Sequence, residues 1–275
     1  MRTMKAALVG LFVSALGFAA CDVRTGDGDL SFDFASGKAE DTWSRTYRLG
    51  SGGRLELVNV NGRIAAEPAS GDTVELVGRR IAKAMSDEGA KDLLAKVEIR
   101  EEVGDERIRV EVRVPRLRGF SRHEVRWEVK VPKGVSVNFQ TTNGGVVLEN
   151  LQGEVHAQTV NGGVVGKGLA TDLVNASAVN GGVQIELAKS LSPDGRIELE
   201  TVNGGVTLQL PETSRATINA RVVNGGVSVT DLDVVTQGEH NRRRLDGTLN
   251  GGGARVNLET TNGGIKLSRT STPSS

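Results

Sequence analysis

The chain has 275 residues, enough for one long domain or two short ones. Lysine plus arginine and aspartate plus glutamate both number 34, so the formal net charge is zero and no overall field favours nucleic acid or another polyanion. Aromatic residues are only 3% of the chain while glycine reaches 36 residues, a balance that favours many short strands with tight turns. The single cysteine, Cys21, excludes an intrachain disulfide and a cysteine metal cluster.

The amino terminus has the features of an export signal. Two positive charges precede an apolar run at residues 6–20, which is shorter than the roughly 20 residues that span a bilayer. We therefore predict a signal peptide over residues 1–20. The run ends Leu-Gly-Phe-Ala-Ala before Cys21, which resembles a bacterial lipobox, with Phe18 where an aliphatic residue is usual. This predicts lipid attachment at Cys21 and a membrane anchor. The alternative is an ordinary secretory signal that leaves a free thiol.

Residues 21–44 are rich in glycine, serine and acidic residues, and we interpret them as a flexible acidic tether. Asp22, directly after the cysteine, resembles an inner-membrane retention signal, but that sorting rule differs between bacterial groups. The prediction is an extracytoplasmic, membrane-anchored lipoprotein, with the choice between inner and outer membrane left open.

Residues 45–140 are predicted to hold the first strands and a small α+β cap. Residues 55–64 fit the repeat template described below, so the array begins there and is interrupted by an insertion. A short helix is predicted after Ser86, because acids follow this residue and a lysine lies near the end of the segment. Alternating apolar residues at 97–99, 108–114 and 125–131 predict half-buried antiparallel strands. We expect this cap to cover the amino-terminal edge of the array.

Asn-Gly pairs recur through residues 141–268, at intervals of 18, 19, 23, 21, 26 and 12 residues from Asn143 onward. The residues four and two before each asparagine are mostly small or apolar, the residue between them is polar, and an apolar residue follows most of the glycine pairs. Two strands with alternating inward positions therefore flank each corner. This predicts an all-β parallel β-solenoid, followed by a disordered tail at residues 269–275. The predicted corners are Asn61, Asn143, Asn161, Asn180, Asn203, Asn224, Asn250 and Asn262.

By the same alternation we expect the asparagines to point inward and to form a ladder of side-chain amides, with glycine permitting the bend. The alternative is that each Asn-Gly is a type I′ turn in an antiparallel β-meander. Seven near-identical corners favour the solenoid. The last interval fits a coil poorly, so the segment from Asn250 to Gly253 is expected to close the stack as a hairpin or bulged cap.

A Val-Pro-Lys-Gly step at residues 131–134, followed by Thr-Val-Asn-Gly-Gly-Val units, resembles a bacterial β-strand-repeat domain of unknown function. Members of that family are named "putative adhesins" and are similar to the head GIN domain. The resemblance covers about residues 45–270. It implies a right-handed parallel β-helix in the cell envelope, and it supplies no catalytic residues.

No motif indicates catalysis, and we predict a protein that is not an enzyme and has no cofactor. The three histidines are far apart and are expected to be solvated, so no metal site is predicted. The enzymatic alternative is a polysaccharide lyase or hydrolase on a β-helix. Its carboxylates would come from the turn acids Asp172, Asp194, Asp231, Asp233 and Asp246.

Two basic clusters are candidate contacts for anionic lipid or envelope polymers, with a solvated surface as the alternative. Their arginines are Arg116, Arg118, Arg122 and Arg126 in one cluster and Arg242, Arg243 and Arg244 in the other. The predicted function is that of a lipid-anchored cell-envelope β-solenoid with an adhesin-like, scaffolding or signalling-contact role. Its partners would be the membrane and an envelope polymer or protein. A self-assembling scaffold is the second alternative, and the oligomeric state stays open.

Overall fold

A computed structural model describes residues 37–114, 121–236 and 241–270. The chain divides into two units, residues 1–34 and 35–275, and every described residue belongs to the second. The predicted signal peptide, Cys21 and the tail from residue 271 lie outside the described residues, as does the predicted tether up to residue 36. Among the described residues there is no helix long and apolar enough to cross a membrane.

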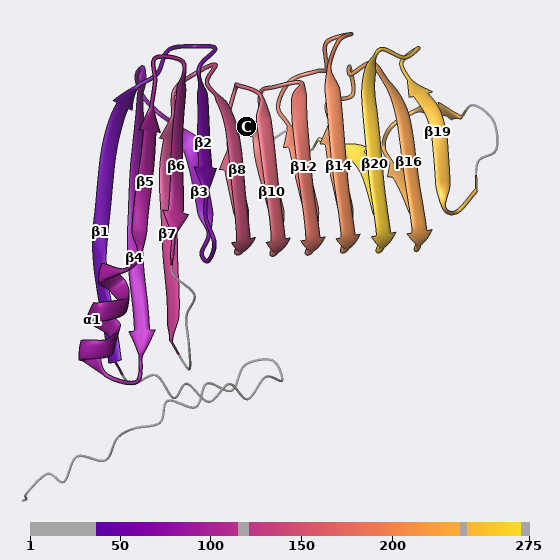
Figure 1. The fold of residues 1–275 in the computed structure, drawn as a ribbon. Coiled ribbons are helices and arrows are strands. Elements are labelled where there is room, and N and C mark those ends of the chain that lie inside the picture. Colours follow the sequence, from indigo (N-terminus) through magenta and orange to yellow (C-terminus); the bar gives the residue numbers. More distant parts are fainter. Residues whose placement is uncertain (1–36, 115–120, 237–240, 271–275) are drawn as a thin grey trace, which may run out of the picture. The chain divides into compact units, whose positions relative to one another are not determined.

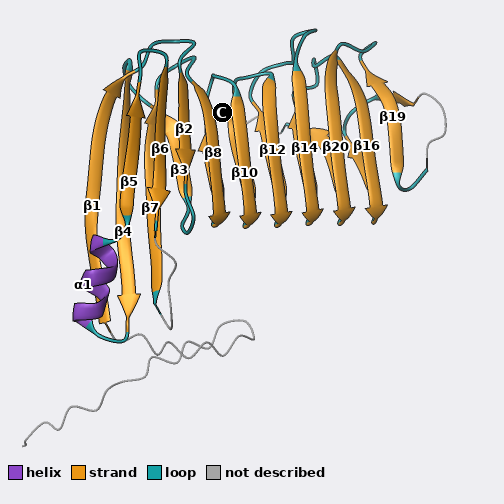
Figure 2. Cartoon of the chain, viewed as in Figure 1, coloured by secondary structure: helices purple, strands orange, loops and turns teal. Residues whose placement is uncertain are grey.

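The described chain forms two β-sheets around one main core, with one short helix that packs over a small second cluster (Figures 1 and 2). Sheet A has the strand order β1 (Gly37–Arg48), β4 (Thr73–Ala84), β7 (Arg122–Val131), β3 (Ile64–Pro68), β9 (Val146–Glu149), β11 (Val164–Leu169), β13 (Val183–Leu187), β15 (Val206–Leu210), β21 (Ile265–Arg269), β17 (Val227–Thr230). Sheet B has the order β18 (Val234–Thr236), β19 (Arg244–Leu249), β16 (Ala216–Asn224), β20 (Ala254–Asn262), β14 (Arg196–Asn203), β12 (Leu173–Asn180), β10 (Val155–Asn161), β8 (Ser136–Asn143), β2 (Arg54–Val58), β6 (Arg107–Arg113), β5 (Glu98–Val103).

Each repeat is one coil of a β-solenoid. A strand of sheet B runs into an Asn-Gly-Gly corner, and a strand of sheet A follows. Neighbouring coils pair in parallel and in register, so Asn161 lies between Asn143 and Asn180. The two strands that flank a corner belong to different sheets and do not pair with each other, which excludes the antiparallel meander.

The coils leave chain order at both ends of the stack. At one end β2 and β3 lie between the coil of β6 and β7 and the coil of β8 and β9. At the other end β20 and β21 lie between the coil of β14 and β15 and the coil of β16 and β17. The predicted cap is therefore partly wrong, because β6 and β7 are themselves a coil and pair in parallel with β2 and β3. Their antiparallel pairing is confined to the outer neighbours β5 and β4.

The core lies between the two sheets and follows the two-residue period of the strands. In one coil, Ile197 and Leu199 of β14 belong to the same core as Val206, Leu208 and Leu210 of β15, and all five are buried. Full burial of such a side chain contributes roughly 1.5–3 kcal/mol. A coil thus holds its two strands together mainly by these inward residues, which leaves the outward residues free for other roles.

The amino-terminal end is closed by β1, β4, β5 and the helix α1 (Asp87–Ala95), which begins after the cap residue Ser86. Strand β1 starts at Gly37, so the prediction of a tether through residue 44 is wrong. Trp43 and Tyr47 of β1 pack against the core. The ring of Trp43 packs edge-on against that of Trp127, with 5.5 Å between the ring centroids. The Tyr47 hydroxyl donates to Glu101 of β5, which joins the edge strands of the two sheets. Burial, followed by this carboxylate, raises the pKa of Tyr47.

Candidate functional site

Seven of the predicted corner asparagines form one continuous ladder of side-chain amides. The Nδ2 atom of each donates to the Oδ1 atom of the asparagine in the preceding coil, over 2.6 to 2.9 Å. In stack order the members are Asn61, Asn143, Asn161, Asn180, Asn203, Asn262 and Asn224. All six bonds have the same direction, so the amide dipoles are aligned along the stack.

The expectation that these asparagines point inward is wrong, because Asn61 is half-buried and the other six are exposed. The alternation of the strand holds up to the residue just before the asparagine, which is outward, and fails at the asparagine itself. There the backbone turns the corner, and the asparagine side chain lies along the outside of it. The ladder therefore stabilises the corners from the solvent side.

The buried polar layer of the corner comes instead from the residue two before each asparagine. The Thr201 hydroxyl donates to the carbonyl of Gly181 in the preceding coil over 2.7 Å, and Thr159 donates in the same way to Gly144. In the coil of β2 and β3 this position holds Asn59, whose Nδ2 donates to the carbonyl of Gly62 over 3.0 Å. The two threonine bonds fix one corner upon the next, and Asn59 does so through a second bond from Nδ2 to the carbonyl of Val125 in the coil of β7, over 2.9 Å.

Asn250 is not part of the ladder. It has a φ of 49°, and its Nδ2 donates to the carbonyls of Glu212 and Ser214 over 2.8 and 2.9 Å. These two residues precede β16, so Asn250 holds the connection from β19 to β20 against the start of β16. The short interval to Asn262 arises because β19 is not a coil strand and pairs antiparallel with β16.

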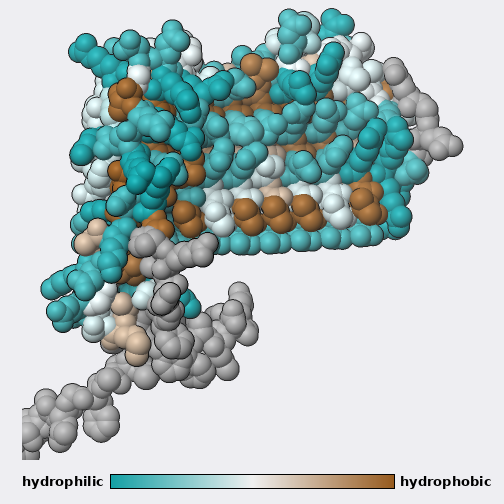
Figure 3. Space-filling view, viewed as in Figure 1, coloured by the Kyte–Doolittle hydropathy of each residue, from teal (hydrophilic) through white to brown (hydrophobic). Residues whose placement is uncertain are grey.

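A row of five valines and two threonines runs beside the ladder on the outer face of sheet B, at the position just before each asparagine. In stack order its members are Val60, Thr142, Val160, Val179, Val202, Thr261 and Val223. Val160, Val179, Val202 and Val223 are 37 to 58% exposed. Figure 3 shows the row as a line of hydrophobic residues, interrupted by paler ones, above the lower, hydrophilic edge of the strands. We call this row the valine stripe. The sequence signal for it was available, since an apolar residue recurs at a position that the alternation places outward.

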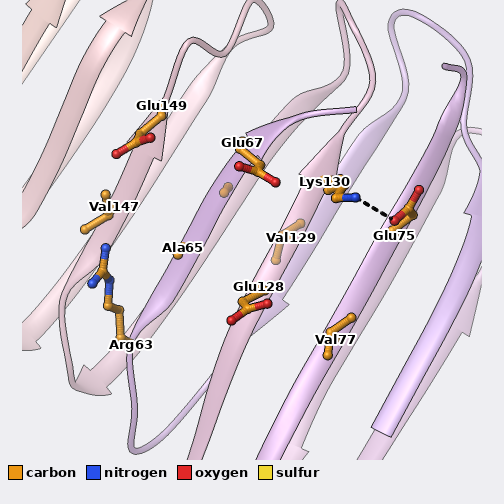
Figure 4. A pocket seen from close by; sticks show the side chains of 11 residues that line it. Arg63, Ala65, Glu67, Glu75, Val77, Glu128, Val129, Lys130, Val147 and Glu149 are labelled. Carbon is orange, nitrogen blue, oxygen red and sulfur yellow. Dashed lines mark ion pairs between the residues drawn. The ribbon is translucent and has the colours of Figure 1, made fainter. Parts of the chain in front are cut away.

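A cleft of about 410 Å³ lies on the outer face of sheet A, over β9, β3, β7 and β4 (Figure 4). Its floor is formed by the small apolar side chains of Ala65, Val77 and Val147, which leave a hollow between longer charged neighbours. Its cations are Arg63 and Lys130, and its carboxylates are Glu67, Glu75, Glu128 and Glu149.

The charges around this cleft are unevenly paired. Lys130 Nζ lies 3.3 Å from Glu75 Oε2. Within the described part of the chain, Glu67, Glu128 and Glu149 form no ion pair. The cleft thus combines an apolar floor with carboxylates that are available to a ligand, and sequence reasoning missed it because its residues come from strands far apart in the chain.

The predicted basic residues do not form one surface. Arg122 and Arg126 lie on β7, near one end of the stack, and Arg116 and Arg118 lie outside the described residues. The carbonyls of Arg242 and Arg243 accept from the N–H groups of β17 and β16, in the last coil. Seven strand spacings separate β7 from β17, or about 34 Å.

Two of these arginines are already engaged by acids. Arg126 Nε donates to Glu124 over 2.6 Å, and Arg244 donates to Asp246. Contact of the remaining arginines with anionic lipid or polymer stays a prediction.

The turn acids are likewise spread out. Asp172 accepts from Ser192, which lowers the pKa of the Asp172 carboxyl, while Asp231 follows β17 three coils away. In the described ranges there is no group of three or more His, Cys, Asp or Glu side chains placed to hold a metal ion. His156 lies on the outer face of sheet B, and His240 lies outside the described residues.

Comparison with known proteins gives a family and a fold. The model of the family described as Toastrack DUF4097 matches residues 11–268. A crystal structure from Clostridium sporogenes, named a "putative cell adhesion protein", is 15% identical with a TM-score of 0.53, covering 84% of this chain and 100% of its own. A "putative adhesin" from Bacteroides fragilis is 14% identical with a TM-score of 0.39, covering 82% of this chain and 97% of its own. The comparison with curated proteins gives no match.

Proposed function

The chain belongs to the Toastrack DUF4097 family, a family of unknown function, and on that premise we propose that it is a lipid-anchored β-solenoid of the cell envelope with an adhesin-like binding role and no catalysis. The name of the Clostridium sporogenes structure supports an adhesion role for that protein, and the shared fold motivates the same proposal here. Cys21, directly after an apolar run of signal-peptide length, supports the anchor.

The observation that carries the binding role is the cleft on sheet A. Apolar floors with a few polar groups at the rim are typical of binding sites. Glu67, Glu128 and Glu149 give the rim a negative charge that Arg63 does not balance, so the ligand class is a cationic group with an apolar stem, such as an amine-bearing polymer or a lysine side chain. Binding of this kind needs no reacting group.

The anchor is tested by supplying labelled palmitate to bacteria that produce the full chain. Wild type is expected to take up label and to fractionate with membranes, whereas Cys21→Ala should do neither. Equal labelling of the two chains would contradict lipid attachment at Cys21.

The binding role is tested with beads that carry the full chain, offered to surfaces coated with chitosan, a cationic glycan, or with a neutral glycan. The triple variant Glu67→Gln, Glu128→Gln, Glu149→Gln should lower retention on chitosan at least about tenfold, and added salt should lower retention of the wild type. The matched control is Glu106→Gln, Glu154→Gln, Glu186→Gln, which makes the same change in charge outside the cleft. Equal loss in both triples would contradict the cleft as the binding site.

The enzymatic alternative has one supporting observation, the gathering of four carboxylates in that cleft. A pair of carboxylates is the usual machinery of glycoside hydrolysis. Release of reducing ends from envelope polysaccharides by wild type, abolished in Glu128→Gln, would favour the enzyme over the binding protein.

A further inference from the structure

The valine stripe is an apolar line on an otherwise polar face. On β10, β12, β14 and β20 its outward neighbours are amides, carboxylates, a serine and a histidine, which line a shallow groove of about 380 Å³. In the described parts of the chain no segment covers this face. The stripe is not needed for the core, because the core residues occupy the alternate, inward positions.

β-Propensity alone does not account for the valines. Thr142 and Thr261 occupy the same position in two coils, and threonine suits a strand as valine does. Valine at the other positions adds exposed apolar area, which costs solubility unless something covers it.

The order of residues in the stripe is symmetric about its centre. Reading outward from Val179, valine is followed by threonine and then by valine in both directions along the stack. A two-fold axis parallel to the strands can lie between two copies, at the level of Val179. It would place Val160 against Val202 of the second copy, Thr142 against Thr261, and Val60 against Val223. Neighbouring members of the stripe are separated by the strand spacing of about 4.8 Å. A second copy has the same spacing, so the two stripes stay in register along their full length.

The polar positions of the five central coils, from β8 to β20, agree with the same axis. In the row next to the stripe, Gln158 would lie opposite Glu200 and Gln140 opposite Glu259, so that amide donors meet carboxylates. In the next row His156 would lie opposite Glu198. Glu200 and Glu259 lie side by side within one copy, and the axis directs neither of them at another acid.

We propose that two copies of the chain pair face to face through the outer face of sheet B, about a two-fold axis at Val179. The coil stacks of the two copies then run in opposite directions, while their strands run in the same direction. The face is seven strands wide, at about 4.8 Å per strand, and five residues long, at about 3.3 Å per residue. Its area is therefore roughly 550 Å², and the pair buries about 1,100 Å² over both copies. That area is at the low end for a specific interface, and the pair is expected to be weak, with a dissociation constant in the micromolar range.

End-to-end stacking is disfavoured by the same structure. Both ends of sheet B finish in antiparallel strands, β5 and β18, and β5 carries the charged residues Glu98, Arg100, Glu101 and Glu102. Charged edges of this kind oppose strand pairing with another molecule. The inference is independent of the cleft on sheet A and of the proposed binding role.

The first test is sedimentation equilibrium of the full chain carrying Cys21→Ala, from about 1 to 100 μM. This chain should dimerise, and Val179→Lys, which brings two lysines together on the axis, should raise the dissociation constant at least about tenfold. Val103→Lys and Val235→Lys are matched controls, because these valines are 59% and 66% exposed but lie outside the stripe. A chain that is monomeric at about 100 μM, that forms growing polymers, or that weakens equally in the controls would overturn the proposal.

The second test addresses the orientation with a short bis-maleimide cross-linker, in the same Cys21→Ala background. Val179→Cys should cross-link to itself. Val60→Cys and Val223→Cys should each cross-link poorly alone and efficiently when mixed, because the axis pairs one with the other. Cross-linking of Val223→Cys alone as efficient as in the mixture would overturn the pairing of oppositely directed stacks.

Discussion

The asparagine ladder ends where the Nδ2 atom of Asn61 lies 3.0 Å from Nε2 of His123. The Oδ1 atom of Asn61 accepts from Asn143, so Nδ2 is the donor of Asn61 and the histidine nitrogen must accept. That role requires a neutral ring with its proton on Nδ1. Burial lowers the pKa of His123, which favours the neutral ring. A histidine therefore accepts the last bond of a ladder that spans seven coils.

This contact predicts a pH dependence of stability. The pKa of His123 is lower in the folded chain than its ordinary value of about 6.5, so the unfolded chain takes up the proton first as the pH falls. The contribution to the free energy of unfolding is complete above about pH 6.5 and is lost below it. Urea unfolding at pH 7.5 and 5.5 should show a smaller fall for His123→Asn than for wild type. Lys83, Arg122 and Glu124 line the same hollow, and they are unchanged in this variant.

The control for that measurement is His156→Asn, on the outer face of sheet B. It should keep the wild-type fall between the two pH values. If the two variants behaved alike, the ladder end would not be the source of the pH dependence.

The exterior position of the ladder predicts a small cost for removing one rung. Asn180→Ala breaks the bonds to Asn161 and Asn203, but both partners are exposed and water replaces the lost bonds. We expect a loss of about 1 kcal/mol in the free energy of unfolding, measured by urea denaturation. Asn257→Ala, a half-buried asparagine outside the ladder, should change it by less than about 0.5 kcal/mol. A loss above about 3 kcal/mol would indicate a buried network and contradict the exterior ladder.

The first residue of each corner after the asparagine must be glycine because the backbone of the neighbouring coil lies too close for a side chain. A Cβ atom on Gly162 would lie 2.2 Å from the carbonyl oxygen of Gly144, and the φ of Gly162 is 150°. Gly162→Ala should cost about 3 kcal/mol or more, or prevent folding, because the stacked backbones have no room to separate. The matched control is Gly264→Ala at the second corner position, where the nearest atom is an ordinary contact at 3.5 Å. Equal thermal melting of the two variants would show that the close approach is not what selects glycine.

The strands and corners could be predicted from the sequence, while the order of the coils could not. The alternation around each Asn-Gly-Gly places the same residue types inward in every coil, and burial in the structure follows it. For that reason the template carries no information about which coil is the neighbour of which. Asn262 fits beside Asn203 as well as Asn224 would, and the structure places it between them.

The candidate site was predicted less well, for three physical reasons. The inward-outward alternation of strand residues ends at the corner. Asn180 is therefore exposed, and the buried hydrogen bond of the corner is made by Thr201. The cleft joins Glu67, Glu128 and Glu149 from strands that only the non-sequential coil order brings together. The valine stripe lies at an outward position of the strands, which a search for core residues passes over. Valine at such a position indicates a surface role, because the core does not require it.

The buried hydroxyl of Thr201 contributes to stability through one hydrogen bond between neighbouring coils. It is 1% exposed and donates over 2.7 Å to the Gly181 carbonyl, so Thr201→Val keeps the shape of the side chain and removes only the bond. We expect a loss of about 1 to 2 kcal/mol in the free energy of unfolding, because the carbonyl loses its partner away from solvent. Ala178 holds the same position in the neighbouring coil, so the fold tolerates the absence of one such bond and the variant should remain folded. Thr207→Val, at an outward position of β15, should change the value by less than about 0.5 kcal/mol, and an equal loss there would assign the effect to strand propensity instead.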